Sequence, residues 1–133
     1  METQKGVYNF SHTDALLAEY DAASKGRGYR WMATLAYAND LYANPPNTPA
    51  SRDAFAAFTV AAVRRYKGRG ILWELWCEPN GVFWDGGKGN VTQYVALATA
   101  VGEGVAKAGL SEEAFIGPNT AMWWQCEFSL YME

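Results

Sequence analysis

Three segments of the chain carry apolar residues at the three- and four-residue spacing that places side chains on one face of a helix. The first runs from Ser11 to Gly26 and begins with a cap-like Ser-His-Thr-Asp sequence. The second runs from Thr48 to Gly68, with Thr48 as the cap and Pro49 in the first helical position. The third occupies about Tyr94 to Gly109. The spacing therefore predicts three helices, each ended by a glycine.

Short runs of large apolar residues lie between and after these helices, at Tyr29–Ala36, Ile71–Trp76 and about Ala114–Gly117. The second run stops before Pro79, and residues that precede a proline avoid the helical region. Helix and strand then alternate, which is typical of parallel strands joined by helical crossovers. We expect one α/β domain over residues 1–133. The pattern alone fits both an open doubly wound sheet and part of a closed barrel.

The composition is that of a globular domain with one sizeable core, with 50% hydrophobic and 19% charged residues in 133. The 11 Lys and Arg and 14 Asp and Glu give a net charge of −3, and the absence of a basic run argues against a nucleic-acid partner. No apolar stretch approaches the roughly 18 residues of a membrane span. One histidine and two cysteines are too few for a structural zinc site, and no cofactor is expected.

Aromatic residues make up 15% of the chain, more than a core requires, because aliphatic side chains fill a core more simply. Flat rings can stack on the apolar faces of a sugar while Asn39 and Asn80 bind its hydroxyl groups. We expect most of the rings at strand ends and in the following loops to be core, and two or three to touch a ligand. These rings belong to Tyr37, Tyr42, Trp76, Phe83, Trp84, Trp123 and Trp124.

Glu78 is the candidate catalytic residue. It follows the apolar run Ile71–Trp76, and parallel α/β proteins build active sites at the carboxyl ends of their strands. Apolar neighbours such as Trp76 and Trp84 would favour the protonated carboxyl group that a general acid needs. The alternative is a solvated loop glutamate.

Glu74 is too far along the same strand to act as the partner carboxylate of Glu78. Four residues of strand span roughly 13 Å at about 3.3 Å per residue, whereas the carboxylates of a retaining glycosidase lie about 5 to 5.5 Å apart. Alternation along a strand would place Glu74, Trp76 and Glu78 on one face. We therefore expect Glu74 to lie in the interior, hydrogen-bonded to a neighbour.

The two cysteines, Cys77 and Cys126, follow neighbouring predicted strands. A disulfide between them is possible by position, although two buried free thiols are the commoner outcome. Cys77 could also act as a thiol nucleophile with His12, but no local nucleophile motif surrounds it. The sequence alone does not decide whether Cys77 and Cys126 pair.

The segment Trp73–Asn80 reads Trp-Glu-Leu-Trp-Cys-Glu-Pro-Asn. It resembles the W-E-x-W-N-E-P-N strand-four motif of clan A glycoside hydrolases, the retaining (β/α)8-barrel enzymes that include family 5 cellulases and family 39 β-xylosidases. Four other segments resemble parts of that barrel. Gly6–Phe10 resembles the stretch after strand two, and Arg30–Asn39 resembles strand three. Arg65–Arg69 resembles the approach to strand four, and Ile116–Pro118 resembles strand five. The resemblance implies a partial (β/α)8 TIM barrel, from the end of unit two through strand five.

By this resemblance, Glu78 is the general acid/base that protonates the leaving glycosidic oxygen and then activates water. Glu74 is structural inside the barrel. Cys77 stands where the family has an asparagine that holds the sugar 2-hydroxyl, and a thiol is a poorer hydrogen-bond partner. The residues expected to contact the substrate are Cys77, Trp76, Asn80, Tyr37, Asn39 and Trp84.

A complete barrel takes about 250 residues, and the family's nucleophile, after strand seven, has no counterpart in these 133. We therefore expect a fragment of a glycoside hydrolase for β-linked oligosaccharides or polysaccharides that does not hydrolyse glycosides alone. A non-catalytic carbohydrate-binding module and an inactive remnant are the alternatives. Uncovered strand edges would favour association with other molecules. The sequence does not indicate a cellular location.

Overall fold

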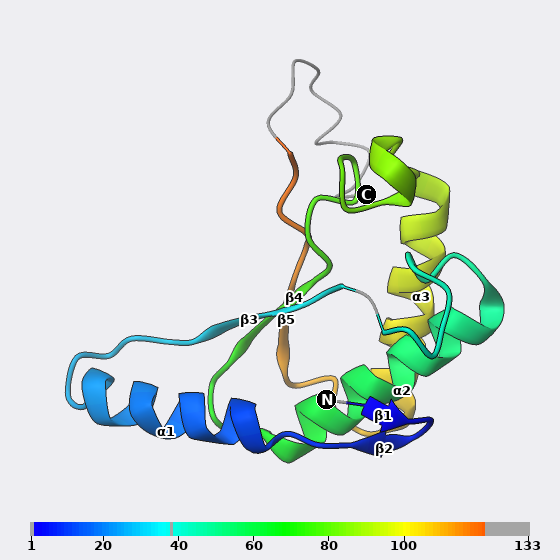
Figure 1. The fold of residues 1–133 in the computed structure, drawn as a ribbon. Coiled ribbons are helices and arrows are strands. Elements are labelled where there is room, and N and C mark those ends of the chain that lie inside the picture. The colour runs from blue at the N-terminus through cyan, green and yellow to red at the C-terminus, as the bar shows by residue number, and fades with distance from the viewer. Residues whose placement is uncertain (1, 38, 122–133) are drawn as a thin grey trace.

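The computed structural model describes residues 2–37 and 39–121 of the chain. All three predicted helices and all three predicted strands are present in that part (Figure 1). An N-terminal hairpin that the spacing did not predict precedes them. In chain order, the elements are β1 (Glu2–Gln4), β2 (Val7–Tyr8), α1 (Ser11–Ser24), β3 (Met32–Leu35), α2 (Pro49–Arg65), β4 (Leu72–Leu75), a short 3-10 helix (Asp85–Gly87), α3 (Val91–Lys107) and β5 (Ala114–Ile116).

The start of α2 confirms the predicted cap. The hydroxyl of Thr48 accepts a hydrogen bond from the Ser51 N–H at 3.2 Å, and the Ser51 hydroxyl accepts one from the Thr48 N–H at 3.1 Å. This reciprocal pair satisfies two donors that a helix end otherwise leaves unpaired. The predicted cap of α1 is wrong in detail. Ser11 is already helical, Phe10 takes the cap position, and no side chain caps that end.

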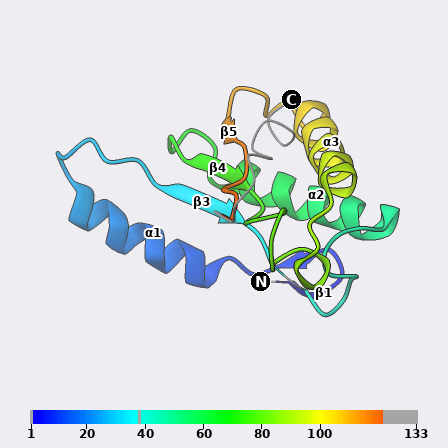
Figure 2. The same cartoon turned by 90° about the horizontal axis from the view of Figure 1, so that it is seen from above.

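The strands β3, β4 and β5 form a parallel sheet in that order. Helices α2 and α3 pack against each other beside it, while α1 runs next to β3 (Figure 2). The core lies between the sheet and the helices, where Trp73 stacks on Tyr66 and the hydroxyl of Tyr94 donates to the carbonyl oxygen of Leu75. No helix of the described residues is long and apolar enough to cross a membrane.

The opposite face of the sheet is more open. On it, Met32 and Ile116 are 50% and 38% exposed. The strand register places six side chains there in two rows across the sheet, and strand pleating directs them away from the core. The rows are Met32, Leu72 and Ala114, and then Thr34, Glu74 and Ile116.

Candidate functional site

Unusual backbone conformations gather where β3 and β4 end. Tyr37, Trp76 and Glu78 have φ values of +73°, +65° and +45°, in the left-handed region that side chains rarely adopt. Asp85, in the loop after β4, has a φ of +44°. Each such residue costs of order 1–3 kcal/mol, and such residues cluster at functional sites. The carboxyl end of the sheet is therefore the first place to look for chemistry.

Glu78 is half-buried at this end, with its backbone held on both sides. Its N–H donates to the backbone oxygen of Asn119 at 2.9 Å and to the side-chain oxygen of the same residue at 3.0 Å. Its carbonyl oxygen accepts from the N–H of Gly81 at 2.9 Å. Its carboxylate, in contrast, makes no hydrogen bond or ion pair with any described residue. Glu78 therefore combines a fixed main chain with a carboxylate that is bound to no described residue.

Glu74 lies on the open face of the sheet but is only 3% exposed. Its carboxylate accepts a hydrogen bond from the Thr34 hydroxyl at 2.6 Å and another from the Asn119 N–H at 3.1 Å. Asn119 in turn holds the N–H of Glu78, so a continuous chain of hydrogen bonds links the two glutamates. Sequence reasoning missed Asn119, although its position shortly after a strand and a proline was a usable signal.

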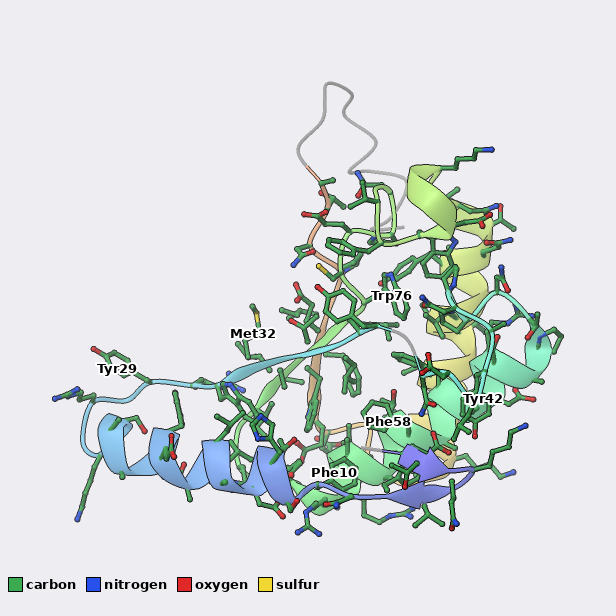
Figure 3. The ribbon with its side chains drawn as sticks, in the orientation of Figure 1. Phe10, Tyr29, Met32, Tyr42, Phe58 and Trp76 are labelled. Atoms are coloured by element: carbon green, nitrogen blue, oxygen red, sulfur yellow. The ribbon has the colours of Figure 1, made fainter. Side chains whose placement is uncertain are left out.

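The expected common face for Glu74, Trp76 and Glu78 is wrong for Trp76. Alternation holds only while the backbone stays extended, and β4 ends at Leu75 because Trp76 turns into the left-handed region. The indole of Trp76 consequently lies on the helix side of the sheet (Figure 3), 5.7 Å between ring centroids from Phe55 of α2.

Neither tryptophan expected to contact a sugar offers it a ring face in this structure. Trp76 is 1% exposed and Trp84 is fully buried, and their rings meet edge to face at 5.3 Å. Both indole N–H groups are satisfied inside the protein, that of Trp76 by the Phe83 carbonyl oxygen and that of Trp84 by the Gln93 side chain. The expectation is corrected accordingly: these two rings are core that supports the loop after β4.

The two asparagines expected to bind sugar hydroxyls are also engaged within the protein. The Asn80 amide donates to the carbonyl oxygen of Ala121 at 3.2 Å and accepts from its N–H at 2.9 Å. The Asn39 amide donates to Glu2 at 3.2 and 3.3 Å and accepts from the Leu41 N–H at 3.0 Å. Asn80 thus joins the loop after β4 to the segment after β5, and Asn39 joins the loop after β3 to the N-terminal hairpin.

Tyr37 lies beside Cys77 and Glu78. Interaction with the Cys77 thiol, then burial, then the nearby charge of Glu78 raise the pKa of Tyr37, so its hydroxyl stays a neutral donor at physiological pH. Its ring packs edge to face on Phe83 at 5.4 Å, and both rings are largely exposed. Cys77 is a free thiol that pairs with Asn119 in an isolated parallel bridge. Tyr37, Cys77 and Glu78 are therefore the predicted site residues that the fold brings together.

Two hollows adjoin this site. The strand-end hollow, of about 220 Å³, lies between the loops after β3 and β4 and is lined by Tyr37, Asn44, Pro45, Trp76, Val82, Phe83 and Asp85. The hairpin hollow, of about 360 Å³, lies between β1, the loop after β3 and the first half of α2. Tyr37 lines both. The wall of the hairpin hollow includes Glu2, Tyr37, Asn39, Asp40, Tyr42, Phe55 and Phe58.

Part of the expected site lies outside the described residues, namely Trp123, Trp124 and Cys126. Within the described ranges, no group of three His, Cys, Asp or Glu side chains is placed to hold a metal ion. Comparisons with protein-family models, curated proteins and solved structures found no match for this chain.

Proposed function

We propose that the chain carries the acid/base half of a retaining β-glycosidase site on a partial (β/α)8 barrel. The observation that supports this best is the state of Glu78. Its main chain is held by Asn119 and Gly81 at a strand end, while its carboxylate has no hydrogen-bond or ion-pair partner among the described residues. An acid that must reach a substrate oxygen needs a rigid main chain and a carboxyl group that is not bound within the protein.

The sheet supports the barrel part of the proposal. Successive units β3-α2-β4 and β4-α3-β5 pair their strands in parallel and place adjacent helices side by side (Figure 2). Barrel interiors are filled by layers of inward-facing side chains from neighbouring strands. The two rows on the open face of the sheet, with Glu74 hydrogen-bonded in the second, have the form of such layers.

The chemistry follows from one proton on Glu78. In the first step the carboxyl group donates this proton to the glycosidic oxygen as the bond from that oxygen to the anomeric carbon breaks and the nucleophile bonds to the carbon. In the second step the carboxylate takes a proton from the water that attacks the same carbon, and the bond from the carbon to the nucleophile breaks. The nucleophile would lie outside these 133 residues, as the resemblance to clan A glycoside hydrolases implies. The neutral Tyr37 hydroxyl and its ring, paired with Phe83, would contact the sugar.

The test is a titration of the chain with cellotetraose and xylotetraose, followed by the backbone amide signals in NMR. The proposal predicts saturable shifts at residues 37, 77, 78, 80, 81 and 119. Because an exposed aromatic contact contributes about 0.5–1.5 kcal/mol, Tyr37→Ala should weaken binding about three- to tenfold. Tyr29→Ala is the matched control, since Tyr29 is also exposed but lies in the loop before β3. Absence of saturable shifts, or equal effects of both variants, would contradict the proposal.

One observation favours a second function, that of a non-catalytic sugar-binding module. Cys77 replaces the asparagine of the family motif, which weakens the expected contact to the substrate. In a module, Glu78→Ala would leave oligosaccharide binding intact and no glycosyl transfer would depend on Glu78. Cys77→Asn tests whether Cys77 faces the sugar. It should raise affinity about three- to tenfold if Cys77 faces the sugar, and leave affinity unchanged otherwise.

A further inference from the structure

The hairpin hollow has properties that the proposed glycosidase site does not use. Its volume of about 360 Å³ lies within the range of roughly 300–1,000 Å³ typical of small-molecule sites. Tyr42 and Phe58 lie beside the N-terminal hairpin (Figure 3), where Tyr42 donates to Glu2 and Phe58 packs on Tyr8. Phe55 and Phe58 are both half-buried in its wall. The hollow therefore offers an apolar surface large enough for a small organic molecule.

The charged residues of this hollow are all of one sign. Glu2 and Asp40 are in its lining, and no lysine, arginine or histidine is. Asp40 makes no hydrogen bond or ion pair with the described residues. The Glu2 carboxylate accepts from the Gly6 N–H and the Tyr42 hydroxyl through one oxygen, and from the Asn39 amide through the other. A carboxylate has about four acceptor positions, so Glu2 retains capacity.

Three polar donors of the lining are, in contrast, already committed. The amide of Asn39 and the hydroxyl of Tyr42 both donate to Glu2, and the hydroxyl of Ser51 donates to the Thr48 carbonyl oxygen. Burial and the Glu2 carboxylate raise the pKa of Tyr42 to about 12, so it stays a donor to Glu2. A ligand would therefore find acceptors with negative charge but few free donors.

One ring of the lining, that of Tyr42, already has a cation of the protein beside it. The ammonium nitrogen of Lys5 lies 5.3 Å from the centroid of the Tyr42 ring, within cation–π range. Lys5 lies over the Tyr42 ring but is not part of the lining, so Phe55, Phe58 and the two carboxylates stay available. We propose that the hairpin hollow binds a small organic cation, an ammonium group on an apolar body, with the ammonium at Glu2 and Asp40 and the body against Phe55 and Phe58.

The test compares three probes of one shape in NMR titrations of the full chain at low ionic strength. They are phenethylammonium, the neutral 2-phenylethanol and the anionic phenylacetate. The proposal predicts saturable shifts at residues 36, 39–44 and 51 with phenethylammonium, and affinities at least about tenfold weaker for the other two probes. High salt should weaken the ammonium complex, because the carboxylates are partly exposed. Equal binding of phenethylammonium and 2-phenylethanol, or no saturable shift, would overturn it.

Variants locate the site without relying on the hairpin. Asp40→Asn should weaken phenethylammonium about fivefold, and it removes no internal contact. Asp53→Asn, an exposed aspartate of α2 outside the hollow, is the matched control and should have no effect. Glu2→Gln should also weaken binding of phenethylammonium. Because Glu2 also holds the hairpin through Gly6 and Tyr42, its effect supports the proposal only if Asp40→Asn weakens binding too. An Asp40→Asn variant that binds as well as the parent would overturn the proposal.

Discussion

Replacement of Glu74 by alanine tests the hydrogen-bonded link between the two glutamates. The carboxylate is almost completely buried and accepts from the Thr34 hydroxyl and the Asn119 N–H. Thr34 is exposed, so its hydroxyl can turn to water, and the contact to Asn119 is the one lost outright.

The magnitude follows from what is removed. A hydrogen bond to a charged group contributes about 1.5–3 kcal/mol, and a buried methylene about 0.8 kcal/mol. The substitution also removes the buried charge of Glu74, which has no cation beside it among the described residues, and this offsets part of the loss. The net decrease in the free energy of unfolding should be about 2 kcal/mol, or about 8 °C in melting temperature for a chain of this size.

The assay combines thermal unfolding with amide hydrogen exchange. Glu112→Ala is the matched control, because Glu112 is exposed and makes no hydrogen bond or ion pair with the described residues. Glu74→Ala should also speed exchange at the Glu78 amide, which Asn119 holds, while the Trp76 amide stays protected by the Leu35 carbonyl oxygen at 2.8 Å. If the two variants melt together, or if exchange at Glu78 is unchanged, the proposed link does not position Glu78.

Three further predictions concern stability and assembly. Gly89→Ala should destabilise the chain by about 1–3 kcal/mol in urea unfolding, because its Cβ would lie 2.8 Å from the Asn80 backbone at a φ of +42°. Hydrogen bonds from Arg65 and Tyr66 lower the pKa of Asp14 below its usual 3.8. The stability that these hydrogen bonds add is present above pH 3.8 and is lost as the pH falls through the lower pKa of Asp14 in the folded protein. In Asp14→Asn, the free energy of unfolding measured in urea should therefore depend less on pH in this range. The open sheet face and its edges should favour association, so light scattering should give a mass above 14.7 kDa, and a strictly monomeric chain would refute this.

Hydrophobic spacing predicted the three helices and the three parallel strands because each element buries a regular stripe or face. The hairpin at Glu2–Tyr8 escaped that reasoning. Its two strands are too short for a period to show, and its hydrogen bonds to Asn39 and Tyr42 come from residues far along the chain.

The site was predictable in its position but not in the direction of its side chains. The end of β4 was expected to matter, and Glu78 lies there with a carboxylate that has no hydrogen-bond or ion-pair partner among the described residues. Trp76 was assigned to the wrong face, because its left-handed backbone leaves no trace in the sequence. Asn80 and Asn39 were expected to face a ligand, but their partners in the fold take both ends of each amide.

The most direct test of the central claim supplies the nucleophile that the chain is expected to lack. Phenyl β-glucoside and phenyl β-xyloside are incubated with the chain, with and without sodium azide. Azide would attack the anomeric carbon as the bond to the phenol oxygen breaks and Glu78 donates its proton to that oxygen. The account predicts no hydrolysis without azide, and azide-dependent release of phenol and an α-glycosyl azide that Glu78→Gln abolishes. Release that is absent, or that is unchanged in Glu78→Gln, would contradict it.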